Sequence, residues 1–436
     1  MRLSLAVLAS LFTTLATALP PGPTEVVERD GQKYVFAHFI LGIVSSYAQS
    51  DWEADMTLAQ SIGIDAFALD IGTDSFNDQQ LGFAYAAAAS VNFKVFISFD
   101  FSYWTSGDIG TMATYMQTYA TQPGQFMYNG AAFVSSFVGD GFAYRTLESQ
   151  SGISLFACPN WQPGSFVNNA NADCGMSWNA AWPNTNNDPI DANITTTLDE
   201  EYISDLAGKP LIILQPSPPG SSRIMERTHT TKNWIFYSDY LLQSRWDEVL
   251  QLQPQFVEIL TWNDFGESHY IGPLHGDNSP LYAGGPTGAE RWVNGMPHDA
   301  WRDVAQVYIS AFKSGASTPT VTTDELVYYY RPSPKDATCS DTVAAQPTGY
   351  EYDDDSVFVI AMLASAGTVT ITSGSNAPVD FQLPAGVSTI AAPMGLGTPT
   401  FSLSSSTAML SGNGGLAISD DCTVYNFNAY VGKISA

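Results

Sequence analysis

One stretch of the chain decides the fold. It reads Phe256-Val257-Glu258-Ile259-Leu260-Thr261 and continues directly as Trp262-Asn263-Asp264-Phe265-Gly266-Glu267-Ser268-His269-Tyr270. The first part is apolar, rich in β-branched residues and of strand length. The second part carries two acids three residues apart and leads into a loop rich in Gly, Pro and His. A buried strand that ends in acids is how an α/β barrel presents reactive side chains at its mouth.

Similar strand patterns recur upstream, and most are followed by a helical pattern. The strands are expected at residues 34–43, 64–70, 93–99, 133–138, 154–158, 176–178, 211–215 and 256–262. The helices are expected at residues 51–63, 78–90, 109–121, 194–207, 238–252 and 298–313, and Asp51 is expected to be the N-cap of the first. Alternating strands and helices imply a parallel sheet. Eight such strands predict an α/β fold of the (β/α)8 TIM barrel type over residues 19–315.

The composition changes at Ser314-Gly315-Ala316-Ser317-Thr318-Pro319, which is typical of a linker. Beyond it the helical patterns stop. Short β-prone runs at residues 357–363, 369–372 and 423–427 lie between turns of Gly, Ser and Pro, as in an all-β sandwich. We therefore predict a β-sandwich accessory domain at residues 320–436, packed on the barrel as a structural module, with a carbohydrate-binding module as the alternative.

The N-terminus predicts a signal peptide at residues 1–18. Arg2 supplies the positive charge, residues 3–15 the apolar segment, and Ala16-Thr17-Ala18 the cleavage site. This apolar run is too short to span a membrane, and no other stretch approaches the roughly 18 apolar residues that a span requires. The mature protein is expected to be secreted and to act outside the cell or in the cell wall.

The charge of the chain restricts its partners. Sixteen Lys and Arg stand against 43 Asp and Glu, giving a net charge of −27. Nucleic acid and anionic membrane both need a basic patch, so neither is expected as a partner. A neutral polymer is compatible with this charge, and the 13% of aromatic residues suit stacking on sugar rings. The protein is expected to be a monomer.

Nothing in the sequence calls for a cofactor or a metal ion. There are five His residues and no H-E-x-x-H motif, no G-x-S-x-G elbow and no phosphate-binding Gly loop. Four cysteines in a secreted chain predict two disulfides. Of the three possible pairings, Cys158–Cys174 with Cys339–Cys422 is favoured because each bridge then stays within one predicted domain, and the other two pairings remain open. The sequon at Asn193 predicts a glycan.

Three of the predicted strands end in an aspartate: Asp70, Asp100 and Asp264. In a barrel, the carboxyl ends of all strands face the same side, so these acids can converge. Each Asp has an alternative use as a helix N-cap. That alternative has about even weight for Asp100, less for Asp70, and least for Asp264 together with Glu267.

Hydrolysis of an acetal needs one acid that protonates the leaving oxygen and one carboxylate that activates water or attacks carbon. Asp264 and Glu267 are three residues apart, so their Cα atoms can lie within ~7 Å across a turn. Their side chains can reach the ~6.5–9.5 Å of an inverting enzyme or the ~5 Å of a retaining one, and spacing alone leaves both open. Glu258 lies about 20 Å further back along the strand. It is expected to be a polar residue low in the barrel.

Aromatic and polar side chains gather at the same strand ends. The rings suited to stacking on sugar faces, with loop packing as the alternative, are Trp104, Trp161, Trp178, Trp182, Trp262 and Tyr270. The polar groups expected to bind sugar hydroxyls are His38, Asp100, Asn160, Gln215, Asn263 and His269.

Together these residues resemble glycoside hydrolase family 71, the fungal α-1,3-glucanases also called mutanases. The matching segments are residues 37–42 (AHFILG), 67–72 (FALDIG), 177–183 (SWNAAWP) and 261–270 (TWNDFGESHY), and the β-rich tail is also similar to that of the family. One departure is Asn179, where the family motif W-x-A-A-W-P suggests an Asp.

The resemblance implies a secreted, endo-acting hydrolase of α-1,3-glucan that inverts the anomeric centre. It places the family's acidic positions on Asp70, Asp264 and Glu267. Asp264 is then the general base and Glu267 the general acid, with the reverse assignment open. Asp70 supports the site by holding the water or a sugar hydroxyl, or by tuning a neighbour's pKa. The alternatives are a hydrolase of another glucan linkage and a non-catalytic protein that binds cell-wall polysaccharide.

Overall fold

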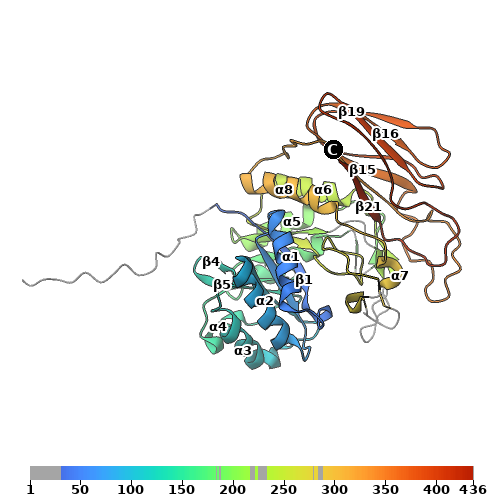
Figure 1. Ribbon diagram of the computed structural model, residues 1–436. Helices are drawn as coiled ribbons and strands as arrows, with labels where there is room; N and C mark the ends of the chain where they lie inside the picture. The colour runs from blue at the N-terminus through green and yellow to red at the C-terminus, as the bar shows by residue number, and fades with distance from the viewer. Residues whose placement is uncertain are drawn as a thin grey trace, which may run out of the picture.

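The computed structural model describes residues 31–182, 184–185, 188–216, 221–223, 233–277, 279–282 and 288–435. The predicted signal peptide at residues 1–18 lies outside the described residues. The described chain begins with a curled, mainly parallel sheet flanked by helices and ends in two antiparallel sheets (Figure 1).

The first sheet contains eight parallel strands in the order β6-β5-β3-β2-β1-β13-β10-β7. Their bounds are β1 Tyr34–Ile40, β2 Ala66–Ile71, β3 Lys94–Asp100, β5 Ala131–Phe137, β6 Leu155–Pro159, β7 Gly175–Met176, β10 Leu211–Pro216 and β13 Phe256–Leu260. A short strand, β4 Met127–Tyr128, runs antiparallel to β5. Since β1 lies between β2 and β13, the first and last parallel strands of the chain are neighbours, and all eight expected strands are present.

The two ends of this strand order, β6 and β7, approach each other without a strand ladder between them in the described part of the chain. The carbonyl of Ala157 accepts hydrogen bonds from Asp173 N at 2.8 Å and from Cys174 N at 3.1 Å. The disulfide Cys158–Cys174 joins the same two segments. The observed architecture is therefore a curled α/β sheet whose ends are held together by two hydrogen bonds and a covalent bridge.

The six expected helices are found close to their predicted positions. The helices are α1 Gln49–Ser61, α2 Asn77–Val91, α3 Ile109–Tyr119, α4 Tyr144–Ser151, α5 Thr197–Leu206, α6 Leu241–Leu252, α7 Glu290–Val293 and α8 Trp301–Ser314. Asp51 was expected as the N-cap of the first helix, but that helix begins two residues earlier, and the Asp51 carboxylate accepts a hydrogen bond from Ala48 N at 2.8 Å. Helices α4 and α7 were not predicted. In eight residues α4 buries only Tyr144, Leu147 and Ser151, and α7 has four residues.

Short elements fill the connections. The 3-10 helices are η1 Leu41–Ile43, η2 Ser106–Asp108, η3 Pro163–Phe166, η4 Trp178–Ala180 and η5 Pro280–Tyr282. Two small hairpins are formed by β8 Asn184–Thr185 with β9 Asp188–Pro189, and by β11 Ser221–Arg223 with β12 Asn233–Ile235. Among the described residues, no helix has both the length and the apolar character needed to cross a membrane.

Alternate residues of the parallel strands enter two separate apolar clusters, as the period of a strand requires. Residues on the outer face pack with the helices, as Phe39 does against Trp52 of α1. On the inner face, a ring of phenylalanines meets at centroid distances of 4.7 to 5.6 Å. We call this ring the aromatic floor; it consists of Phe36, Phe96, Phe133 and Phe256.

The C-terminal part consists of two four-stranded antiparallel sheets. The first has the order β18-β15-β14-β21, from Gly386–Pro393, Ser356–Leu363, Glu325–Tyr330 and Tyr430–Ser435. The second has the order β17-β16-β19-β20, from Val379–Leu383, Gly367–Thr372, Thr400–Ser405 and Met409–Asn413. Leu326 and Tyr328 of β14 share one apolar cluster with Ile371 and Phe401 of the second sheet.

The other face of the first antiparallel sheet packs on the helices of the α/β part. Val327 and Tyr329 belong to the same cluster as Trp301 of α8. The sheet is thus buried on both faces, and α6 and α8 lie beneath it in Figure 1. The C-terminal sheets therefore share a core with the α/β part.

Two sequence expectations for this part have different outcomes. The expected strand at residues 423–427 is wrong: the segment forms a loop, in which the side chain of Asn426 accepts a hydrogen bond from Asn428 N at 3.0 Å. The predicted disulfide pairing is confirmed, since Cys339–Cys422 joins this loop to the segment after β14, and Cys158–Cys174 joins the ends of the first sheet.

Candidate active site

A layer of polar side chains lies directly above the aromatic floor. Two residues further along each of its four strands, the inward position is occupied by a polar residue. We call this set the polar layer; it consists of His38, Ser98, Ser135 and Glu258. All four are at most 3% exposed. The inside of the sheet therefore changes from apolar to polar towards the carboxyl ends of the strands, the side on which barrel enzymes place their chemistry.

His38 joins three neighbouring strands. Its Nδ1 lies 2.9 Å from Oε1 of Glu258 on β13, and its Nε2 lies 3.8 Å from Oδ2 of Asp70 on β2. Burial opposes a charge on the ring. The hydrogen bonds and charges of Asp70 and Glu258 outweigh burial and raise the pKa of His38 to about 10. The ring is therefore a buried imidazolium between two carboxyl groups at neutral pH.

Asp70 and Asp100 end adjacent strands on the same side. Asp100 Oδ1 accepts a hydrogen bond from Ser102 N at 2.8 Å. Burial, and then the negative charge of Asp70, raise the pKa of Asp100 to about 6. The charge of Asp70 therefore acts on Asp100, and the structure brings together two strand-end aspartates that are 30 residues apart in the sequence.

The loop after β13 is tied to the end of β1. Trp262 N donates to His38 O at 2.8 Å. The Asn263 side chain accepts from Ile40 N at 2.8 Å and donates to Ile40 O at 3.1 Å. The loop then returns on itself, because Gly272 N donates to Trp262 O at 2.8 Å. A Cβ at Gly272 would lie 2.5 Å from that oxygen, so the return requires glycine.

A turn within this loop, between Trp262 and Gly272, carries the two acids. Asp264 N donates to Thr261 Oγ1 at 2.7 Å, and Glu267 N donates to Asp264 Oδ1 at 2.9 Å. His269 N donates to Asp264 O at 3.0 Å, and the ring nitrogen Nδ1 of His269 lies 3.9 Å from Glu267 Oε2. Both acids are partly exposed, so backbone hydrogen bonds place two accessible carboxyl groups within one turn.

Two half-buried tryptophans stand beside these groups. Trp182 stacks on His269 with a centroid distance of 4.5 Å and an interplanar angle of 15°. Trp178 meets the edge of His38 at 5.1 Å and contacts Phe137 at 4.7 Å. Both rings belong to the segment around η4 and keep part of their surface exposed. They are the two predicted tryptophans that the structure brings to the site.

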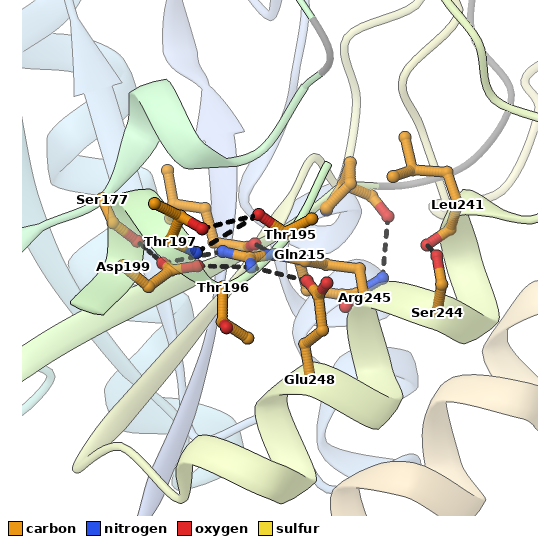
Figure 2. Close-up of polar contacts among 12 residues, drawn as sticks. Ser177, Thr195, Thr196, Thr197, Asp199, Gln215, Leu241, Ser244, Arg245 and Glu248 are labelled. Carbon is orange, nitrogen blue, oxygen red and sulfur yellow. Dashed lines mark hydrogen bonds and ion pairs between the residues drawn. The ribbon is translucent and has the colours of Figure 1, made fainter. Parts of the chain in front are cut away.

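A buried ion pair anchors the start of this tryptophan segment (Figure 2). Ser177 Oγ donates to Asp199 Oδ1 at 2.7 Å. Arg245 binds both oxygens of Asp199, at 2.6 and 2.9 Å, and donates from Nε to Leu214 O at 3.0 Å. It also contacts Glu248 at 2.9 Å. We call Ser177, Asp199, Arg245 and Glu248 the anchor cluster.

The other four predicted aromatic rings are packed in the outer cluster, at most 5% exposed. Trp104 donates from Nε1 to Ile71 O at 2.9 Å, Trp161 contacts Phe166 at 5.6 Å, and Trp262 contacts Phe67 at 5.2 Å. Tyr270 stacks on His298 at 3.9 Å. These rings present no open face to a sugar, and loop packing describes their positions.

Tyr270 also connects the site to the C-terminal sheets. Asn428, just before β21, donates from Nδ2 to Tyr270 Oη at 3.0 Å. His298 lies between them, with Nδ1 2.8 Å from Tyr270 O and Nε2 3.0 Å from Asn428 Oδ1. The loop that carries the two acids is therefore secured partly by a residue near the end of the chain.

The remaining predicted residues lie at strand ends or on the surface. Asn160 directly follows β6, Gln215 lies in β10, and both are buried. Neither side-chain oxygen has a hydrogen-bond partner among the described residues. Gln215 Nε2 donates to Pro216 O at 3.1 Å and Leu242 O at 3.2 Å. Asn179 donates to Tyr202 Oη at 3.3 Å. Asn193 is exposed.

Sequence reasoning placed Glu258 low in the barrel and away from the chemistry. In the structure Glu258 is fully buried, as a polar residue inside the sheet would be, but its Oε1 lies 2.9 Å from Nδ1 of His38, whose Nε2 faces Asp70. The signal was in the sequence: Phe256 and Glu258 share one strand face, and Phe36 and His38 share the face of the next strand. The register that pairs Phe36 with Glu258 brings these faces together, and only the structure gives that register. Within the described ranges, no group of three His, Cys, Asp or Glu side chains could hold a metal ion.

Comparison with known proteins identifies the family of the chain. The profile of glycosyl hydrolase family 71 matches residues 31–436. The chain belongs to glycosyl hydrolase family 71. It is similar to a mutanase of Penicillium rubens, with 45% identity over 99% of this chain and 95% of that one.

Two Schizosaccharomyces pombe proteins are also similar. A glucan endo-1,3-alpha-glucosidase is 36% identical over 93% of this chain and 95% of its own. An ascus wall endo-1,3-alpha-glucanase is 29% identical over 97% and 100%. This family 71 member is a glycoside hydrolase. The four sequence segments that resemble the family contact one another in turn. His38 contacts both Asp70 and Trp178, and Trp182, in the same segment as Trp178, stacks on His269.

Proposed function

We propose that this family 71 enzyme is a secreted, endo-acting hydrolase of α-1,3-glucan that inverts the anomeric configuration. The observation that carries the proposal is the turn that holds Asp264 and Glu267 at the carboxyl end of β13, beside the half-exposed ring of Trp182. Three relatives match at least 93% of this chain. They are named as a mutanase, a glucan endo-1,3-alpha-glucosidase and an endo-1,3-alpha-glucanase, and these names support α-1,3-glucan as the substrate.

In this proposal Asp264 is the general base and Glu267 the general acid. The hydrogen bond from Glu267 N fixes the Asp264 carboxylate, which suits a base that has to hold a water in one direction. Glu267 protonates the leaving oxygen, and the water attacks from the opposite face, which needs carboxyl groups about 6.5–9.5 Å apart. Asp70 holds the water or a sugar hydroxyl, and Trp178 and Trp182 stack on sugar rings.

The architecture and processing proposed for the enzyme follow the sequence expectations. We infer that the curled sheet is a (β/α)8 barrel over residues 19–315, closed between β6 and β7 through the Ala157 hydrogen bonds and the Cys158–Cys174 bridge. Residues 320–436 form the accessory β-sandwich, residues 1–18 are a signal peptide, and the exposed Asn193 carries a glycan. The enzyme acts as a monomer, without a cofactor, on cell-wall α-1,3-glucan.

Substitution of either acid tests the catalytic assignment. Asp264→Asn and Glu267→Gln should each lower hydrolysis of insoluble α-1,3-glucan by about 10²- to 10⁴-fold, the usual contribution of acid–base catalysis. Circular dichroism and the midpoint of thermal unfolding should stay near those of the wild type. Glu53→Gln on α1 is the matched control and should keep full activity. Near-normal turnover in either site variant would remove that residue from the mechanism.

The anomer of the first product tests the stereochemistry. NMR of early hydrolysis should show the β-anomer, because inversion at an α-linkage creates it; α-anomer first would mean a retaining mechanism. Parallel assays on α-1,3-, β-1,3- and α-1,4-glucans distinguish the proposed substrate from other linkages. Binding of α-1,3-glucan without release of reducing sugar would favour a binding protein instead.

A further inference from the structure

Glu258 is a fully buried acid that the two-carboxylate mechanism does not use. It lies in the middle of β13, with no exposed side-chain surface. It is flanked on its own strand face by Phe256 and Leu260, both in the inner apolar cluster. Burying an acid in such surroundings is unfavourable unless a partner compensates it. Its position therefore needs an explanation.

His38 is that partner. Nδ1 of His38 lies 2.9 Å from Glu258 Oε1, and both side chains are buried. The other oxygen, Oε2, has no hydrogen-bond partner among the described residues. A structural ion pair would be expected to use both oxygens, since unsatisfied buried acceptors are destabilising. Within the described residues, the side-chain hydrogen bond of Glu258 goes to a single ring nitrogen.

The opposite edge of the same ring faces the active site. Nε2 of His38 lies 3.8 Å from Asp70 Oδ2, and the ring edge packs on Trp178. A histidine whose Nδ1 is anchored presents its Nε2–H in one fixed direction. The orienting carboxylate of a hydrolytic triad acts on its histidine in the same way. Here the oriented edge meets a second carboxylate at the mouth of the sheet.

We propose that Glu258 is a positioning residue of the active site: it fixes the His38 ring so that Nε2–H faces Asp70, and thereby holds Asp70 in the orientation that receives water or a sugar hydroxyl. This inference rests on the proposed function in one respect, namely that Asp70 faces the substrate.

The charges around His38 make the proposal testable by pH. The groups that act on the ring are Asp70 from β2 and Glu258 from β13. On β3, the pKa of Asp100 is raised by burial and by the charge of Asp70 and lowered by that of His38. Together they keep His38 charged at neutral pH. Removing the charge of Glu258 takes away one of the two carboxyl groups that raise the pKa of His38, and burial then lowers it further. The ring then loses its proton as the pH rises, and Asp70 loses its cationic neighbour.

The experiment compares the wild type with Glu258→Gln in the full chain, with histidine labelled at Cε1. NMR should show a wild-type His38 signal that does not titrate between about pH 5 and 8, and a Glu258→Gln signal that does. The signal is assigned by its loss in His38→Gln. In the same variant kcat should fall on the order of 10²-fold, the effect of a misplacement of about 1 Å, and kcat/KM should gain a limb that falls with rising pH.

Two further variants separate positioning from stability. Glu248→Gln, in the anchor cluster, is a matched substitution and should leave the His38 signal and the pH profile unchanged. Glu258→Asp keeps the charge but moves it, so His38 should stay charged while kcat falls with little change in KM. Glu258→Asp also serves if Glu258→Gln does not fold.

A folded Glu258→Gln enzyme with wild-type His38 titration and wild-type pH profile would overturn the proposal. An unchanged kcat in Glu258→Asp would overturn the positioning role. If the wild type cleaves a different glucan, the substrate proposed above fails, but the same comparison on that glucan still decides the role of Glu258.

Discussion

The protein contains two buried ionic clusters that use similar chemistry in opposite ways. In the anchor cluster, both oxygens of Asp199 and all three nitrogens of Arg245 have partners. In the cluster of His38, Glu258 and Asp70, one oxygen of Glu258 and Oδ1 of Asp70 have no hydrogen-bond partner in the described part of the chain, and the Nε2 contact is long at 3.8 Å.

This is the difference that we expect between a structural ion cluster and a functional one. Saturated hydrogen bonding holds elements in place, and here it fixes Ser177, the residue before Trp178, between α5 and α6. Unused hydrogen-bonding capacity is unfavourable for folding and useful for binding, because it can be satisfied by substrate or water. We therefore expect the anchor cluster to determine stability and the His38 cluster to determine catalysis.

The largest expected effect is the loss of stability when the anchor cluster is broken. Asp199→Ala leaves the Arg245 guanidinium buried without its main partner, which should lower the free energy of unfolding by about 3–5 kcal/mol. Urea denaturation at neutral pH measures this loss. Activity per folded molecule should retain the wild-type pH profile, because His38 and its partners are untouched.

A double variant provides the control for this prediction. Asp199→Leu with Arg245→Met removes both charges, and most of the stability should return, since buried pairs are often replaceable by apolar residues. A single variant that loses less than about 1 kcal/mol would contradict the structural role of the cluster.

The next prediction concerns the cluster of His38, Glu258 and Asp70, where a substitution should lower kcat and leave stability nearly unchanged. Asp70→Asn removes the charge that faces His38 Nε2, and kcat should fall about 10²-fold, equivalent to roughly 2.7 kcal/mol in the barrier. The free energy of unfolding should change by less than about 1 kcal/mol, because Oδ1 of Asp70 has no hydrogen-bond partner among the described residues. Steady-state kinetics and urea denaturation on the same sample test the contrast. A large stability loss with normal kcat would reverse the distinction between the two clusters.

The smallest effect concerns Asp100, whose pKa burial and Asp70 raise to about 6. Between about pH 4 and 6 the folded state binds more protons than the unfolded state, so its stability falls as the pH rises through this window. Asp100→Asn should remove that slope and stabilise the protein by on the order of 1 kcal/mol at pH 7, with the difference disappearing below pH 4. Thermal unfolding at several pH values measures it. Equal slopes for variant and wild type would show that Asp100 is not perturbed.

The sequence predicted the elements of the α/β part well because each strand and helix has its own periodic pattern. It also placed Asp70 at the end of one strand and Asp264 and Glu267 after the end of another, and the structure has them in β2 and in the turn after β13. The anchor cluster was not foreseen, since Asp199 and Arg245 lie on helices 46 residues apart and only tertiary packing pairs them.

Burial was the property that the sequence could not supply. Trp161 and Trp178 both follow a strand closely, yet the first is fully buried and the second half-exposed. Whether such a tryptophan is buried depends on which face of its loop meets the neighbouring helix. Trp161 meets α5, where the hydroxyl of Tyr202 donates to Trp161 O at 2.8 Å. Most strands of the C-terminal sheets were missed, and in β19 (TFSLSS) the frequent Thr and Ser weaken the apolar pattern.

The hydrogen bond between Asn428 and Tyr270 has a consequence for co-translational folding. The two residues are 158 positions apart, so the loop with the two acids leaves the ribosome long before the residue that secures it. At about 5–20 residues per second this interval lasts roughly 10 to 30 s. A nascent chain therefore completes its first sheet before Asn428 is available to hold the loop with the two acids, and full activity should appear only after Asn428 has been synthesised.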